Sequence, residues 1–382
     1  MVEHPAGKTT WPELFFDLGL VLLVNRLSSF LEETPNLEHL ALMGLLAMPI
    51  WLSWCGITFL ASRFSPRSHI ERLLFIIATV FAVVLATSLS APFTTKAAVF
   101  SVGYAGIRWC LVILYRVADR RTGNSLAHFY TYAFAIGATC WTVAIFVPGP
   151  TRFILWGLGV AADAIVPFWA GRRGLLKANP VNPRQFPDRF GLIVIIALGE
   201  GGLCIGGAIT SLPFDMKSVL PALVAIWIVA AIFWRYFAPF EPEEEEEERH
   251  AVLGGPTGGR IARDLFSFGH YPAFFGIVTA SAGIKIFLGA LDDSDLTRTG
   301  VELVAIGIVS FLATVTAVDI VLWDRRLGWR HSVIIPITLV CMVALISWPL
   351  VLMVVLASCL SVSALLSGEE RLALLKKAHV SR

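Results

Sequence analysis

Long apolar runs dominate this chain and constrain its fold more than any other feature. A helix needs roughly 20 apolar residues to cross a hydrocarbon layer of ~30 Å. Twelve runs of about this length occur, at 12–30, 38–61, 71–90, 97–115, 128–147, 153–171, 190–211, 218–238, 265–290, 300–323, 332–347 and 349–366. Because 56% of the residues are apolar and only 15% are charged, a soluble fold has too little polar surface to enclose them. The sequence predicts an all-α integral membrane protein in a lipid bilayer.

The distribution of basic residues predicts the orientation. With the N-terminus placed in the cytoplasm, twenty-three of the 30 Lys and Arg residues fall in cytoplasmic segments and four in the opposite loops. Such an excess is typical of cytoplasmic loops. We therefore expect one transmembrane domain, 1–382, in the plasma membrane, with both termini and the tail 367–382 in the cytoplasm. The last two runs, 332–347 and 349–366, form either a helical hairpin or one interrupted span, so the count is about twelve.

Several function classes lack support in the sequence. A net charge of +2 gives no basic surface for nucleic acid. The six cysteines form no C-x-x-C pair and have no histidine at ligand spacing, so we expect no metal site. No nucleotide-binding or hydrolase motif occurs, so no cofactor and no catalytic residue can be assigned. No pattern indicates an oligomeric state.

Two segments of four predicted helices, 71–171 and 188–323, resemble each other in order and spacing. Asp163 near the end of the first copy precedes an arginine pair, as Asp319 does near the end of the second. Because each copy has an even number of helices, the two have the same orientation in the membrane, as in a parallel repeat. Chance similarity among apolar helices is the alternative.

An acidic loop, 239–262, lies inside the second copy and contains Glu243 to Glu248. It is predicted to be a solvated, flexible linker on the cytoplasmic side, with cation sensing as the alternative. The remaining helices, in 12–61 and 332–366, lie outside the two copies.

Glu200 is the clearest candidate for a functional group. It lies near the middle of the run 190–211, between Gly199 and Gly201. A charge at the bilayer centre costs roughly 2.5–3.5 kcal/mol on insertion scales, so it needs a partner, a wet cavity or neutralisation. Burial disfavours the ionised carboxylate, which makes Glu200 a candidate proton carrier. A structural hydrogen bond to another helix is the alternative.

Three further charged residues lie within predicted spans. Arg108 is at a similar depth to Glu200 and is the candidate counter-charge for it. Asp163 lies in the middle of its span, and Asp319 lies in the inner third of its span, where water or an arginine can satisfy it. For all three, a functional role and structural pairing are equally compatible with the sequence.

Acidic residues and a histidine mark the cytoplasmic ends of two spans. Glu13 and Asp17 are one turn apart at the start of the first span, where acids also complement the helix dipole. His270 is at the inner end of the run 265–290, and it is either a proton relay or a satisfied polar contact. Lys285, at the outer end of that run, is expected to extend toward the interface and to pair with Glu302.

Aromatic residues make up 12% of the chain. Trp51 and Trp54 in the second span, and Trp323 and Trp329 near the inner interface, are interpreted as interfacial belts or packing residues. An aromatic cavity is the alternative for some of them.

Two acidic motifs resemble those of the low temperature requirement protein A family of bacterial membrane proteins. The first is Glu13-Leu-Phe-Phe-Asp17-Leu, and the second runs from Asp188-Arg-Phe-Gly-Leu to Leu-Gly-Glu200. Trp51, Trp54 and Arg63, and His270 with Pro272, also fit the family pattern. The resemblance implies a polytopic helical inner-membrane protein in which Glu13, Asp17, Glu200 and His270 occupy family motif positions. Gly201 departs from the pattern, where serine is expected, as does Asn25-Arg26 in place of a milder polar pair.

Two functions follow as hypotheses. The first is a transporter or permeation pathway for a small solute or ion, coupled to protons through Glu200, with Asp17 and His270 along the cytoplasmic approach. The second is an intramembrane enzyme in which Asp17, Asp163 or Glu200 protonates an apolar isoprenoid or lipid substrate and aromatic faces stabilise the cation. Openings toward both aqueous faces favour transport, and a closed aromatic chamber open only to lipid favours the enzyme.

Overall fold

The computed structural model describes residues 10–66, 68–211, 213, 215–237, 253–255, 257–322 and 333–380, and most of these residues are helical, with no strand among them. The acidic run from Glu243 to Glu248, Trp323 and Trp329 lie outside the described residues. The helices are α1 (Trp11–Glu33), α2 (Leu37–Phe64), α3 (His69–Ser88), α4 (Ala97–Thr122), α5 (Ser125–Phe146), α6 (Pro150–Arg172), α7 (Leu175–Ala178), α8 (Gln185–Ser211), α9 (Met216–Phe237), α11 (Gly258–Ile261), the π-helical segment η2 (Ala262–Gly269), α12 (Tyr271–Gly289), α13 (Ser294–Leu322), α15 (Ile334–Leu345) and α16 (Pro349–Val380).

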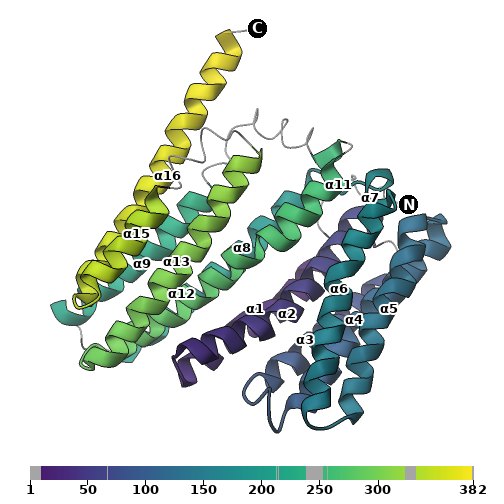
Figure 1. Cartoon of the computed structure of the whole chain (residues 1–382), viewed down its shortest axis with the longest axis horizontal. Coiled ribbons are helices and arrows are strands. Elements are labelled where there is room, and N and C mark those ends of the chain that lie inside the picture. Colours follow the sequence, from purple (N-terminus) through teal and green to yellow (C-terminus); the bar gives the residue numbers. More distant parts are fainter. Residues whose placement is uncertain are drawn as a thin grey trace. The chain divides into compact units, whose positions relative to one another are not determined.

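Eleven helices in the described part of the chain are long and apolar enough to cross a membrane. The all-α membrane fold is therefore confirmed, with one correction to the count. The run expected as a span at 332–347 contains α15, whose 12 residues extend only about 18 Å at 1.5 Å per residue. Because α15 packs against α16 after a short turn, the hairpin is the correct alternative (Figure 1).

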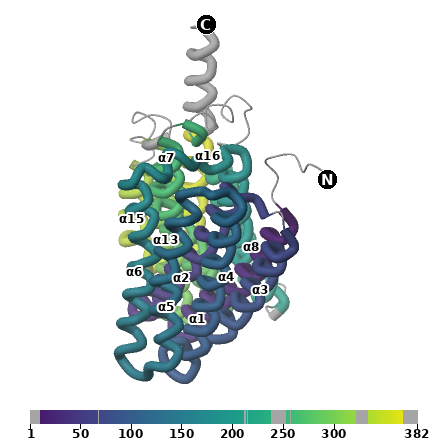
Figure 2. Tube along the Cα trace, turned by 90° about the vertical axis from the view of Figure 1, so that its right-hand side faces the viewer, coloured from purple at the N-terminus to yellow at the C-terminus, as the bar shows by residue number. Residues whose placement is uncertain are grey.

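The helices divide into two compact units, and each is described by itself. The first unit comprises Met1–Phe30, Leu42–Ile193 and His250–Ser267. Within it, α3, α4, α5 and α6 pack against one another in chain order (Figures 1 and 2). Local signals set their ends: Ser68 and Glu71 form a capping box at α3, and Asn124 accepts two backbone N–H bonds at α5.

The second unit comprises Leu31–Ala41, Val194–Arg249 and Phe268–Arg382. Its closest helix pair is α12 with α13, which lie side by side in Figure 1. Glycines make this approach possible, because a Cβ added at Gly276 would lie 2.5 Å from the Gly307 carbonyl oxygen, and one at Gly283 would lie 2.6 Å from that of Gly300. Such small residues let helix backbones come together in membranes.

The α12–α13 pair gives a direct test of this packing. Gly307→Ala is expected to destabilise the protein by about 1–3 kcal/mol, the cost of overpacking a tight contact, because its Cβ would lie 2.3 Å from the Gly276 carbonyl oxygen. The matched control is Gly206→Ala on α8, where an added Cβ meets nothing within 4 Å. Thermal unfolding in detergent measures both, and equal midpoints for the two variants would contradict the assigned packing.

Candidate functional site

Arg108 and Asp163 form a buried ion pair between α4 and α6. Arg108 Nη2 lies 2.5 Å from Asp163 Oδ1, and each side chain is 1% exposed. Tyr104 donates to the other carboxylate oxygen at 2.9 Å. The absence of a side chain at Gly137 makes room for the carboxylate, since a Cβ there would lie 2.5 Å from Asp163 Oδ1. The structure thus pairs Arg108 with Asp163, and the expected pairing of Arg108 with Glu200 is wrong.

Aromatic rings pack closely around this ion pair. The Arg108 guanidinium lies 4.6 Å from the centre of the Phe134 ring. Tyr104 and Trp141 have ring centroids 4.3 Å apart, and Trp141 stacks on Trp156 at 5.4 Å. Distances of this size are those of direct aromatic contact. The neighbourhood of Asp163 is therefore filled with packed side chains.

Asp17 forms a second buried ion pair, with Arg189 at the start of α8. Arg189 donates to both carboxylate oxygens, with Nη2 2.9 Å from Oδ1, and the indole of Trp54 donates to Oδ1 at 3.0 Å. Bidentate pairing of this kind is the strong form of an Arg–carboxylate contact. The two acidic motifs of the sequence, far apart in the chain, thus meet at Asp17 and Arg189.

Glu13 is fully buried one turn earlier in α1. Its carboxylate accepts hydrogen bonds from Thr10 Oγ1 at 2.7 Å, from the Thr10 backbone N–H at 3.2 Å and from Gln185 Nε2 at 3.1 Å. It therefore closes the first turn of α1 and ties it to the first turn of α8, consistent with a role at the helix N-terminus.

Trp51 and Trp54 do not form an interfacial belt. Each is 1% exposed, and both rings contact Phe190, with centroids 6.0 and 4.9 Å away. The belt interpretation is wrong because this face of α2 is enclosed within the first unit and the Trp54 indole binds Asp17. Both residues belong to the packing around the Asp17–Arg189 pair.

Arg235 and Asp319 form a third buried ion pair, between α9 and α13 of the second unit. Nη2 lies 2.5 Å from Oδ2, the side chains are 1% and 2% exposed, and Arg235 Nε donates to Ser363 at 2.9 Å. Arg235 therefore pairs with the Asp319 carboxylate, in agreement with one of the alternatives that the sequence left open. Neither Arg189 nor Arg235 was identified from the sequence as the partner of a buried aspartate, because a sequence does not show which side chains of different helices face each other.

Glu200 lies in a different environment from these paired aspartates. It is 3% exposed, and the Cys204 thiol one turn later donates to its Oε1 at 3.3 Å. A carboxylate oxygen of Glu32, at the end of α1, completes a set of three potential ligand atoms that all lie within 4.8 Å of one another. The sequence predicted no metal site because the cysteines and histidines lack ligand spacing, and it did not connect Glu32 with Glu200 and Cys204, from which Glu32 is remote in the chain.

Lys285 joins this group from α12. Its ammonium forms an ion pair with Glu32 and also interacts electrostatically with Glu200 and Cys204. The prediction that Lys285 pairs with Glu302 is wrong. Glu302 instead pairs with Arg298, four residues earlier on α13, with Arg298 Nε 3.1 Å from Glu302 Oε1. We refer to Glu32, Glu200, Cys204 and Lys285 as the carboxylate cluster.

Glycines precede and follow Glu200 in α8, and they lie on different faces of this helix. Gly199, Gly202 and Gly206 line an apolar groove of about 690 Å³ between α8 and α9. Gly201, where serine was expected, faces the other way: an added Cβ would lie 3.1 Å from Val229 Cγ2 and 3.2 Å from the Ser281 hydroxyl. Glycine at 201 therefore allows α9 and α12 to approach α8 closely beside Glu200.

His270 is 4% exposed and stands at the N-terminus of α12, where its ring meets the edge of Tyr236 with centroids 6.1 Å apart. The structure therefore places it in the second unit as a packed polar group.

The comparisons with known proteins agree with this architecture. The family model described as "Bacterial low temperature requirement A protein (LtrA)" matches residues 8–366, nearly the whole chain. The chain is also 25% identical over 289 residues to an uncharacterized protein of Rhizobium meliloti (strain 1021), covering 72% of this chain and 68% of the relative. No solved structure matches. The chain belongs to the LtrA family of bacterial membrane proteins.

The Arg108–Asp163 pair makes the first unit sensitive to loss of either charge. Asp163→Asn is expected to destabilise the protein by about 3–5 kcal/mol, because it leaves a buried arginine without its counter-charge. Arg108→Met combined with Asp163→Leu is expected to recover part of this loss, since it removes both charges. Thermal unfolding in detergent provides the measurement, with Asp292→Asn on an exposed loop as the control. A midpoint for Asp163→Asn equal to that of the control would exclude a structural role for the pair.

Proposed function

We propose that this LtrA-family chain is a membrane pathway for a small ion or solute, coupled to protons through the carboxylate cluster of Glu200, Glu32, Cys204 and Lys285. The observation that carries the proposal is that two carboxylates and a thiol converge within 4.8 Å inside the second unit. Glu32 lies at the end of α1 and Glu200 lies between Gly199 and Gly201 of α8, one turn before Cys204.

The charges of the cluster favour a proton or a monovalent cation as its ligand. Glu32 and Glu200 bring two carboxyl groups together, and the ammonium of Lys285 forms an ion pair with Glu32. Two carboxyl groups this close repel each other when both are charged, and a proton or a cation bound between them reduces that repulsion.

The position of Glu200 along its helix supports the same function. It lies fifteen residues after the start of α8 and eleven before its end, which is about 22 Å and about 16 Å at 1.5 Å per residue. The group is therefore remote from both ends of the span, at the depth where ionisable side chains mark ion and proton pathways. The neighbouring glycines permit the local helix opening that such a site requires.

The enzyme hypothesis has less support. It requires a neutral acid that faces a chamber for an apolar substrate. Asp17 and Asp163 are instead each bound to an arginine and to a second donor, Trp54 and Tyr104 respectively. The carboxylates of Asp17 and Asp163 are thus held by their arginine partners, and the rings around Asp163 pack in direct contact. Of the three acids considered for the enzyme hypothesis, only Glu200 remains a candidate for the proton donor.

We also propose that the segments 71–171 and 188–323 are copies of one four-helix repeat. In each copy, an arginine on the second helix and an aspartate on the fourth form a buried pair: Arg108 with Asp163, and Arg235 with Asp319. Equivalent placement of Asp163 and Asp319 was one of the correspondences on which the sequence match rests. The repeat supports a transport function, because transporters are often built from such duplications.

Proton movement through reconstituted protein tests the proposed function. Liposomes that contain the protein and a trapped pH-sensitive dye, with an imposed K⁺ diffusion potential, are expected to acidify or alkalise faster than empty liposomes. Glu200→Gln is expected to reduce this rate to that of empty liposomes, because glutamine carries no exchangeable acid proton. Glu302→Gln, which removes an exposed glutamate of α13, serves as the matched control and is expected to retain the flux.

A second measurement does not depend on the transported solute. Dicyclohexylcarbodiimide reacts with carboxyl groups in apolar surroundings, so it is expected to label Glu200. Peptide mass spectrometry locates the modified residue. Unchanged flux in Glu200→Gln, or absence of both flux and Glu200 labelling in the folded natural chain, would overturn the proposal.

A further inference from the structure

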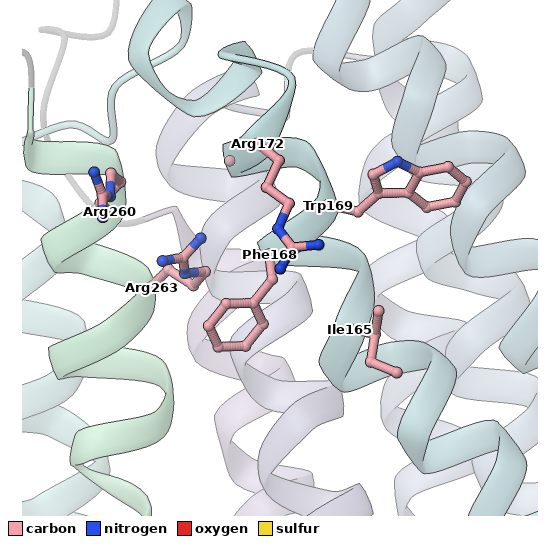
Figure 3. A pocket seen from close by; sticks show the side chains of 7 residues that line it. Ile165, Phe168, Trp169, Arg172, Arg260 and Arg263 are labelled. Atoms are coloured by element: carbon pink, nitrogen blue, oxygen red, sulfur yellow. The ribbon is translucent and has the colours of Figure 1, made fainter.

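A separate cavity lies at one end of α6 in the first unit. Its volume is about 740 Å³, and it is lined by Ile165, Phe168, Trp169, Gly171, Arg172, Arg260 and Arg263. Figure 3 shows α6 carrying Phe168 and Arg172 opposite the segment that carries Arg260 and Arg263. The predicted orientation puts this end of α6 at the cytoplasmic face of the membrane.

The three arginines give the cavity a positive charge that nothing in the described part of the chain fully balances. Arg172 and Arg260 are exposed and make no ion pair with another described residue. Arg263 is 8% exposed and donates to the carboxylate of Asp264 at 2.5 and 2.8 Å. One carboxylate against three guanidinium groups leaves a net charge of about two positive units at the cavity.

Arg263 is held in place from two sides. Its guanidinium lies 4.2 Å from the centre of the Phe168 ring, a cation–π contact. It also lies against the backbone of α6, because a Cβ added at Gly171 would be 2.5 Å from Arg263 Nη1. The guanidinium is therefore pre-positioned in the cavity wall, and a glycine in α6 is what makes room for it.

The other wall of the cavity is apolar and suited to hydrocarbon. Ile165, Phe168 and Trp169 are 60%, 41% and 44% exposed, and in a membrane protein exposed apolar side chains of a spanning helix contact lipid. Ile165 lies seven residues, or about two turns, before Arg172 on α6, a distance of about 10 Å. A ligand that fits both walls of the cavity therefore combines an anionic group with an apolar tail.

We propose that this cavity binds the headgroup of an anionic phospholipid, with the phosphate between Arg172, Arg260 and Arg263 and the acyl chains along Ile165 and Phe168. Guanidinium groups match the oxygens of a phosphate in bidentate geometry, and basic pockets between spanning helices on the cytoplasmic side bind anionic headgroups. A free anion would use the arginines but would leave the apolar wall without a function. This site is independent of the carboxylate cluster.

Lipid-dependent stability of the purified protein tests the proposal. Phosphatidylglycerol added to delipidated protein in detergent is expected to raise the unfolding temperature, while phosphatidylcholine has little effect. Arg172→Gln combined with Arg260→Gln is expected to lower the apparent affinity for phosphatidylglycerol about tenfold. Arg120→Gln combined with Arg184→Gln removes the same charge from two exposed arginines elsewhere in the first unit and is expected to behave like the natural chain.

Two further arms make the result decisive. Gly171→Ala, whose Cβ displaces the Arg263 guanidinium, is expected to weaken the phosphatidylglycerol response without removing any charge. Inorganic phosphate is expected to give no shift at concentrations where the lipid acts. Equal lipid responses in the two double variants would overturn the site, and a full shift with inorganic phosphate alone would show that a soluble anion is its ligand.

Discussion

The cost of placing charge in hydrocarbon governs this structure. A charged side chain at the centre of a bilayer costs roughly 2.5–3.5 kcal/mol on insertion scales, and the described residues meet that cost by pairing arginine with aspartate across helices. Arg108 with Asp163 joins α4 to α6, Asp17 joins α1 to Arg189 of α8, and Arg235 of α9 joins Asp319 of α13. Apolar helices have little energetic preference for one neighbour over another in lipid, so these pairs help to specify which helices meet.

The carboxylate cluster differs from these pairs in its composition. Each Arg–Asp pair joins one guanidinium to one carboxylate, and Trp54 and Tyr104 donate in addition to Asp17 and Asp163. Glu200 and Glu32 instead share one ammonium, that of Lys285, with a weakly donating thiol. The Arg–Asp pairs therefore fit a structural role, and the proposed function rests on the cluster of two carboxyl groups, a thiol and an ammonium.

The sequence predicted the helices of this protein better than the contacts between their side chains. Apolar run length was enough to predict the long helices, because the bilayer fixes the length of a span. The partners of Arg108 and Lys285 were predicted wrongly, since hydropathy gives the depth of a residue but not its direction around the bundle. Glu32 was overlooked because it lies at a helix end, where acids are ordinarily solvated. The shortness of α15 was hidden by apolar residues in the adjoining turn.

The segment that supplies Arg260 and Arg263 has an unusual backbone that fits a binding role. Residues 262–269 form a π-helix directly after the single turn of α11, and π-helical turns are rare and concentrate at functional sites. A π turn holds more residues than an α turn, so it changes the direction in which successive side chains point. Here it carries Arg263, whose guanidinium is packed against Gly171 and Phe168 of α6. The contacts of Arg263 with Gly171 and Phe168 thus offset the less favourable geometry of the π-helical backbone.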